Sequence, residues 1–167
     1  PWKNHGPLTA KVAYTMSSAF QHILYEVDDG VADIMLNRPP LNLIDRDITE
    51  AYFAALEMAD QDPDVRVIVL SGKGKGLSAG VNLRWLEQFD AADMHAFLRL
   101  YYVESIQRTR ALSKPIIAQV HGDAREGGCT LAFGCDMVIA SDDATFGYPG
   151  VPNLAAPPGM HTWILQK

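Results

Sequence analysis

Two strand-like runs, each followed by a glycine-containing turn and a helical pattern, constrain the fold of this chain most strongly. The first is the apolar run 65–71 with the glycine-rich stretch 72–80, and the second is the run 115–120 with a polar turn and Gly127-Gly128. A strand ending in such a turn directs backbone N–H groups outward, and the next helix adds unpaired N–H groups and the positive end of its dipole. Both corners can therefore hold negative charge, and their glycines allow a ligand to approach the backbone.

Neither corner carries a nucleotide-binding motif. The chain has no Gly-x-Gly-x-x-Gly after a first strand and no Gly-Lys-Ser/Thr of a phosphate loop. A glycine pair at a strand-to-helix turn is often turn chemistry alone. Two such corners in one small domain, however, could each offer one N–H to a single oxygen, and this arrangement is an oxyanion hole.

Strands and helices alternate along the rest of the chain. The runs 22–27 and 31–36 flank Asp28-Asp29-Gly30, which predicts a hairpin. Further along, the patterns predict a helix over 47–60, a helix over 91–112, strands over 135–141 and 144–147, and a proline-rich loop over 150–159. The alternation indicates a parallel α/β core, in which the strand 65–71 is covered on both faces.

The longest helical pattern, over 91–112, has one apolar side. Its members are Met94, Phe97, Leu98, Tyr101, Tyr102 and Ile106. We expect this side to face the core of the protein rather than a cofactor, because a stripe of this kind is typical of a core-facing helix.

Size and composition indicate one globular domain without nucleic acid or membrane partners. The 167 residues are 48% hydrophobic, carry a net charge of −6 and include no apolar run long enough to span a membrane. Residues 1–15 show no clear period and precede Met16, so they are a candidate leader, and 16–167 form the predicted core domain. Cys129 and Cys135 are expected to be reduced thiols, which favours a cytoplasmic protein.

Two further classes of site are not supported by the sequence. The five histidines are dispersed, without the paired spacing that a metal site on a helix or finger needs. Gly-x-Ser-x-Gly is absent, so no Ser/His/Asp triad is predicted.

Four motifs, in order, resemble the crotonase superfamily, also called the enoyl-CoA hydratase/isomerase family. They are Leu36-Asn37-Arg38-Pro39, Ser78-Ala79-Gly80-Val81-Asn82, Gly127-Gly128-Cys129 with Cys135-Asp136, and Phe146-Gly147-Tyr148-Pro149. The resemblance implies an α/β fold with a crotonase-like ββα spiral core. The family's helical C-terminal region is apparently missing after Lys167, so a homo-oligomer, trimer or hexamer, is expected only where that region is present.

The resemblance also implies an acyl-CoA substrate, with coenzyme A entering as part of the substrate and no separate cofactor. The backbone N–H groups of Val81 and Gly127 would stabilise the enolate oxygen of the thioester, where negative charge gathers during reaction. The implied CoA contacts are Ser78, Ala79 and Leu41, with Arg84, Lys73, Lys75 and Arg38 either near the phosphates or solvated. Trp85, Leu86 and Phe89 would line the acyl pocket or pack on the core.

The acid/base pair departs from the family pattern. The two glutamates of the family's hydratases correspond here to Thr130 and Gly150, and neither can move a proton at neutral pH. Our hypothesis is that Glu126 or Asp123 supplies a replacement acid/base, or that Arg125 binds an acidic acyl group. These three residues could instead cap the helix and pair with one another.

Other polar residues near the second corner are weaker candidates. His121 ends the strand, Asp143 and Tyr148 are further candidate proton carriers, Tyr148 is also a candidate substrate contact, and His161 is expected to be structural.

The expected function is that of an acyl-CoA enzyme, a lyase or isomerase of this family, whose reaction differs from two-glutamate hydration. The alternatives are a decarboxylase, thioester hydrolase or ring-modifying reaction, and a catalytically silent acyl-CoA-binding protein or structural subunit. A further alternative is a fragment that folds only with a partner.

Overall fold

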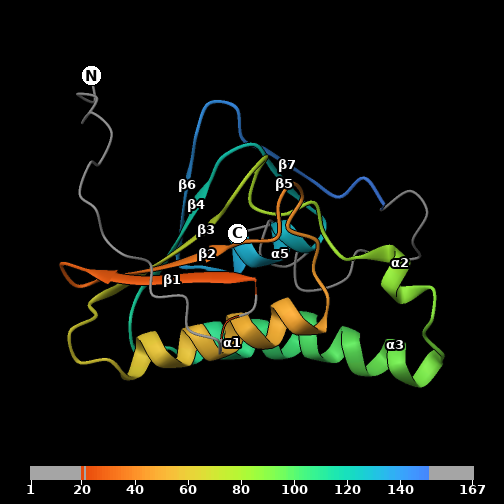
Figure 1. Ribbon diagram of the computed structural model, residues 1–167, viewed down its shortest axis with the longest axis horizontal. Coiled ribbons are helices and arrows are strands. Elements are labelled where there is room, and N and C mark those ends of the chain that lie inside the picture. The colour runs from red at the N-terminus through yellow and green to blue at the C-terminus, as the bar shows by residue number, and fades with distance from the viewer. Residues whose placement is uncertain (1–19, 21, 151–167) are drawn as a thin grey trace.

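A five-stranded sheet with helices along one face forms the body of the protein (Figure 1). The structure is a computed structural model that describes residue 20 and residues 22–150. The candidate leader 1–15, most of the proline-rich loop and His161 lie outside these residues.

The large sheet has the strand order β1-β2-β3-β4-β6. Its strands are β1 (Ile23–Asp28), β2 (Val31–Leu36), β3 (Val67–Gly72), β4 (Ile116–Val120) and β6 (Met137–Ala140). The first two are antiparallel and are joined by the predicted hairpin turn, whereas the other neighbouring pairs are parallel. This confirms the predicted α/β core, and β5 (Asp123–Arg125) pairs with β7 (Thr145–Gly147) in a second, two-stranded sheet.

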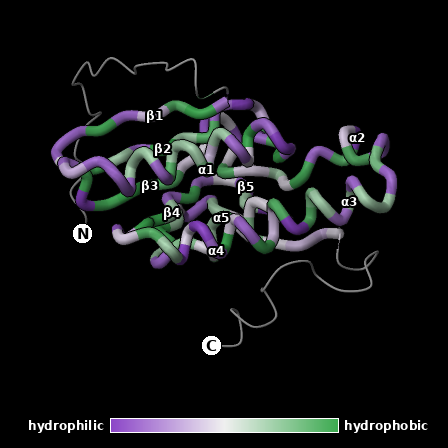
Figure 2. Tube along the Cα trace, turned by 90° about the horizontal axis from the view of Figure 1, so that it is seen from below, coloured by the Kyte–Doolittle hydropathy of each residue, from purple (hydrophilic) through white to green (hydrophobic). Residues whose placement is uncertain are grey.

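The helices are α1 (Arg46–Gln61), α2 (Leu83–Leu86), α3 (Ala91–Leu98), α4 (Ser105–Ala111) and α5 (Gly127–Gly134). A π-helical turn, η1 (Arg99–Glu104), joins α3 to α4. Seen from the helix side, α1 lies against the hairpin strands, and α4 lies beside α5 (Figure 2). Alternate side chains of the central strands, such as Ile34, Ile68 and Ala118, are fully buried and form the core with α1.

The sequence predicted that the strand over 65–71, observed as β3, is covered on both faces. For the described part of the chain this prediction is wrong. Val67 and Val69 alternate with fully buried neighbours and are only half-buried. On the edge strand β6, Met137 and Ile139 are 54% and 61% exposed. The reason is that α1 and the long helical segment that begins with α3 lie along one face of the sheet (Figure 1).

Two local predictions also need correction. The helix expected over 91–112 is interrupted by η1, and Leu98 is 38% exposed instead of facing the core. Residues 123–125, predicted to be a polar turn, form β5 because β7 pairs with them in parallel. No helix in the described ranges is both long and apolar enough to cross a membrane.

Candidate active site

The two glycine-containing corners lie directly against each other. Gly76 pairs with Gly122 in an antiparallel bridge, and Ser78 pairs with Ala124 in a parallel bridge. The N–H of Arg125 donates to Ser78 O at 2.9 Å, which continues the contact. A Cβ at Gly128 would lie 2.4 Å from Ser78 O, so a residue with a side chain could not pack here without a shift.

The backbone N–H of Val81 points away from Ile44, the residue opposite it. Ile44 donates to Gly80 O at 2.9 Å and accepts from Asn82 N at 2.8 Å, forming a parallel bridge opposite Val81. In a parallel bridge these two bonds use the residues on either side of Val81, so its own N–H points away from Ile44. None of the described residues accepts a hydrogen bond from this N–H.

Gly127 begins α5 and presents the second backbone N–H of interest. The carbonyl of Glu126 accepts from Thr130 N at 3.2 Å inside the helix. Since the N–H and C=O of a trans peptide point in opposite directions, the N–H of Gly127 points out of the helix N-terminus. The carbonyl of Gly127 accepts from the Tyr101 hydroxyl at 2.6 Å.

Glu126 has a backbone conformation that favours glycine, with φ 49° and ψ −113°. Such a conformation costs on the order of 1–3 kcal/mol and is concentrated at functional sites. The side chain packs over the first corner, because a Cβ added at Gly80 would lie 2.7 Å from Glu126 Cβ. Its carboxylate accepts a hydrogen bond from the N–H of Gly150. The carboxylate therefore reaches the position where the resemblance places the second family glutamate.

Asp123 and Arg125 pair with each other at the rim of the site. The Asp123 carboxylate accepts from Thr145 Oγ1 at 2.6 Å and from Arg125 Nε at 2.9 Å, and these groups lower its pKa. Both side chains are more than one third exposed. Their arrangement matches the alternative in which these residues pair with one another.

The phenol of Tyr102 lies near Glu126, and that of Tyr148 lies beside α5. Burial, with the nearby Glu126 charge, raises the pKa of Tyr102 to about 12. Burial also raises the pKa of Tyr148, whose side chain hydrogen-bonds with Cys129 and Thr130. Both phenols are therefore protonated near neutral pH. Cys129 and Cys135 are free, and burial raises the pKa of the Cys129 thiol.

A small surface hollow brings together three of the predicted CoA contacts. Leu41, Ser78 and Ala79 line it, and Lys75 and Asp123 lie at the same hollow. The N–H of Ala79 donates to Leu41 O at 2.9 Å, which holds two sides of the hollow together.

The other candidate residues are distributed around these corners. Lys73 and Arg84 are exposed, and Asp143 is exposed and hydrogen-bonds with Ser141. His121 contacts Gly74 O through Nε2 at 3.0 Å. Trp85 packs in an aromatic cluster, with ring centroids 4.5 Å from Phe89 and 4.9 Å from Phe97.

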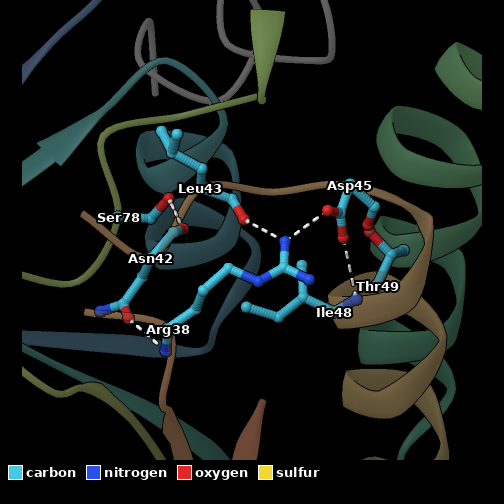
Figure 3. A network of polar contacts seen from close by, with 7 residues as sticks. All are labelled: Arg38, Asn42, Leu43, Asp45, Ile48, Thr49 and Ser78. Carbon is cyan, nitrogen blue, oxygen red and sulfur yellow. Dashed lines mark hydrogen bonds and ion pairs between the residues drawn. The ribbon is translucent and has the colours of Figure 1, made fainter. Parts of the chain in front are cut away.

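Asn42 organises the first corner and was missed by the sequence analysis. Its side chain is fully buried, and Nδ2 donates to the carbonyls of Lys73, Gly76 and Leu77 at 2.9–3.1 Å. Figure 3 shows Asn42 also accepting from the Arg38 N–H and from the Ser78 hydroxyl. Its φ of 47° is one that asparagine tolerates better than most residues, but an asparagine in a loop is by itself only a weak sequence signal for such a position.

Arg38 is paired with a side chain of its own loop. Its guanidinium forms an ion pair with Asp45 and donates to Leu43 O at 3.2 Å (Figure 3). Because the Asp45 carboxylate also accepts from Ile48 N at the start of α1, this pair fixes the loop to the helix. This pairing differs from both roles considered for Arg38, which were a phosphate contact and a solvated surface charge.

Within the described ranges, no group of three or more His, Cys, Asp or Glu side chains is arranged to hold a metal ion.

Comparisons with known proteins agree with this fold. The family model described as enoyl-CoA hydratase/isomerase matches residues 26–167. A protein of Mycobacterium bovis named "probable enoyl-CoA hydratase" is 36% identical over 142 residues, which cover 84% of this chain and 54% of that protein. The crotonyl-CoA hydratase of Syntrophomonas wolfei is 32% identical over 144 residues, with coverages of 85% and 55%.

A solved structure shows the same fold. The crystal structure of an enoyl-CoA hydratase from Thermoplasma volcanium matches with a TM-score of 0.79 and 32% identity, over 86% of this chain and 58% of that one. The chain thus spans about half the length of the relatives it matches.

The sheet, the helices on its one face and the adjoining glycine corners define a crotonase-fold α/β protein. More specifically, the chain belongs to the enoyl-CoA hydratase/isomerase family, as the sequence motifs predicted.

Proposed function

We propose that this chain carries the thioester site of an acyl-CoA enzyme in which Glu126 replaces the usual glutamates as the proton carrier. The N–H groups of Val81 and Gly127 act as the two donors to the thioester oxygen. Leu41, Ser78 and Ala79 contact the CoA portion of the substrate, with Lys73 and Arg84 near its phosphates. Trp85 and Tyr148 lie toward the acyl group.

The observation that carries the proposal is the hydrogen bond from the Gly150 N–H to the Glu126 carboxylate. It brings the Glu126 carboxylate to position 150, where this chain has glycine and the resemblance places the family's second glutamate. The same side chain lies over Gly80, the neighbour of Val81, so it is close to one of the two proposed donors. Asp123 is the less favoured carboxylate, because it is bound by Arg125 and Thr145 at the rim.

In the proposed chemistry, the Glu126 carboxylate removes a proton from the α-carbon of the thioester. The C–H electron pair forms a double bond between the α-carbon and the carbonyl carbon, the C=O π pair moves onto oxygen, and the two N–H groups stabilise the resulting enolate oxygen. Removing one such donor in other enzymes costs about 3 kcal/mol. With a 3-enoyl ester, the protonated Glu126 then gives its proton to the γ-carbon while the enolate collapses and the β,γ double bond becomes an α,β double bond, which balances an isomerisation.

The test is turnover on a panel of thioesters: crotonyl-CoA, a 3-enoyl-CoA and a malonyl-type CoA ester. Glu126→Gln keeps a hydrogen-bond acceptor for Gly150 but cannot take a proton, so we expect at least a hundredfold loss of kcat on the preferred ester. Asp123→Asn is the matched control and is expected to retain activity within threefold. Equal activity of Glu126→Gln and the unmodified protein would eliminate the proposed role.

A second candidate function is a catalytically silent acyl-CoA-binding protein. It is favoured by Thr130 and Gly150, which cannot carry protons, and binding without turnover of any of the three esters would support it. A cytoplasmic location and homo-oligomeric assembly are part of the proposal for the whole protein. The location is supported by free cysteines in the described residues and by the bacterial origin of the relatives, whereas the assembly rests on the family resemblance alone.

A further inference from the structure

We propose that Tyr101 is a positioning residue for the Gly127 amide and that the π-helical turn η1 directs it there. This inference rests on the proposed function, since the N–H of Gly127 is one of the two donors to the thioester oxygen. Tyr101 would act through Gly127 and would not itself touch the substrate.

The contact between Tyr101 and Gly127 is buried and direct. The hydroxyl donates to Gly127 O at 2.6 Å, and the side chain is 1% exposed. The ring is fixed by neighbours, because it stacks on Phe97 at 5.9 Å and meets Tyr102 edge-on at 4.8 Å. A hydrogen bond from so restrained a side chain holds its acceptor in one place.

This bond completes the fixation of the backbone on both sides of Gly127. The preceding peptide plane, which carries the Gly127 N–H, is held by the bond from Thr130 N to Glu126 O. The following plane is held by Tyr101 through Gly127 O. Glycine has wide backbone freedom, so an amide at this residue needs anchors on both sides to keep one direction.

A larger residue could not supply this rigidity at position 127. A Cβ there would lie 2.9 Å from the Tyr101 hydroxyl and 3.0 Å from Ile44 Cδ1. A side chain at position 127 would therefore displace the Tyr101 hydroxyl or Ile44, so with glycine at this position the restraint comes from a neighbouring side chain.

The π-helical turn explains why this side chain reaches Gly127. In a regular α-helix, consecutive residues point about 100° apart, so two neighbours rarely face the same site. A π turn closes i→i+5 bonds and contains one extra residue, and such turns are frequent at functional sites. Here Tyr101 and Tyr102 are 1% and 8% exposed, with the first bonded to Gly127 and the second near the Glu126 charge.

The test compares Tyr101→Phe with Tyr52→Phe. Tyr52 is an equally buried tyrosine, 2% exposed, and its side-chain bond is to Thr109. Turnover is measured on the preferred ester, and acetoacetyl-CoA serves as a direct probe because its enolate absorbs in the near ultraviolet. The absorbance of the bound probe reports how well the site stabilises negative charge on oxygen.

For Tyr101→Phe we expect about a tenfold fall in kcat and a smaller enolate fraction of bound acetoacetyl-CoA, with KM and probe affinity within threefold. Tyr52→Phe should change neither readout. If Tyr101→Phe does not fold, Tyr101→Met, which fills the core flexibly without a hydroxyl, should show the same loss.

Two results would overturn the inference. The first is a Tyr101 variant that retains kcat and the enolate signal while the unmodified protein is active. The second is an equal loss in Tyr52→Phe, which would indicate a general packing effect. If the unmodified protein itself neither turns over an ester nor forms the enolate, the proposed function fails, and this inference fails with it.

Discussion

At the scale of single residues, the hydrogen bonds of Asn42 join the first corner to the loop before α1. One buried amide donates to three carbonyls of the first corner and accepts from the Arg38 N–H. The backbone carbonyl of Asn42 accepts from the Ser78 hydroxyl at 2.8 Å. The Asn42 side chain thus adds to the backbone bonds, such as those of Ala79 N with Leu41 O and Ile44 N with Gly80 O, that attach the first corner to the loop before α1.

Asn42→Asp tests this role with almost no change in shape. A carboxylate has no proton to donate, so it would face three carbonyl oxygens that lose their donor. We expect a loss of more than about 3 kcal/mol in the free energy of unfolding. Urea denaturation measures it, and Asn82→Asp is the control because Asn82 makes no side-chain cap bond. A loss below about 1 kcal/mol would contradict the role of Asn42.

The candidate site could be predicted in part from single residues. The two glycine corners suggested an oxyanion hole because glycine turns before helices follow simple rules of backbone geometry, and the resemblance to the family assigned its two donors to Val81 and Gly127. Asn42 could not be recognised this way, since its three acceptors lie more than thirty residues along the chain. The hydrogen bond between Glu126 and Gly150 joins residues far apart in sequence and was likewise not predictable.

At the scale of elements, the start of α1 depends on Asp45. Its carboxylate accepts from Ile48 N at 3.3 Å as an N-cap and forms the ion pair with Arg38. The two side chains are 13% and 23% exposed, so the pair is partly shielded from water. The loop before α1 and the helix itself are therefore stabilised by the same carboxylate.

Asp45→Ala and Asp45→Asn separate these two contributions. Alanine removes both the cap and the ion pair, and we expect a loss of about 2 kcal/mol, of which the cap supplies about 1 kcal/mol. Asparagine keeps the cap and should lose about half as much. Asp90→Ala is the control at α3, where the carboxylate caps Asp93 N without a partner cation. Equal losses for both Asp45 variants would show that the cap contributes nothing.

Most elements followed from periodicity, and the exceptions have a physical cause. The hairpin, α1, β4 and β6 were predicted within a few residues because their apolar patterns are local. The strand β5 has only three residues, and it exists through its pairing with β7 about twenty residues away. The π-helical turn η1 leaves the helical spacing of the apolar side chains over 91–112 recognisable, so spacing alone predicted one continuous helix.

At the scale of the whole molecule, the core holds several weak acids in their neutral form. Burial raises the pKa of Tyr52, Tyr101 and Cys129, and it raises that of Tyr102 and Cys135 to about 12. The ordinary values are 10.0 for tyrosine and 9.0 for cysteine. Between the ordinary and the folded values, the unfolded chain has released protons that the folded chain still holds.

This difference predicts loss of stability in alkali. The stabilisation is fully present below about pH 9 and declines as the pH rises toward the folded values, because the folded chain binds more protons there. Each group contributes a slope of about 1.4 kcal/mol per pH unit once its unfolded form is ionised. Denaturant unfolding at pH 8, 10 and 11 measures the free energy at each point.

Tyr52→Phe isolates one of these protons. We expect the variant to lose stability less steeply between pH 10 and 11 than the unmodified chain, by about 1 kcal/mol per pH unit. Phe97→Leu is the non-titrating control, since Phe97 is fully buried and its truncation should lower the free energy of unfolding equally at each pH. Parallel curves for Tyr52→Phe and the unmodified chain would mean that Tyr52 ionises equally in both states, and burial in the core would then not keep its phenol neutral.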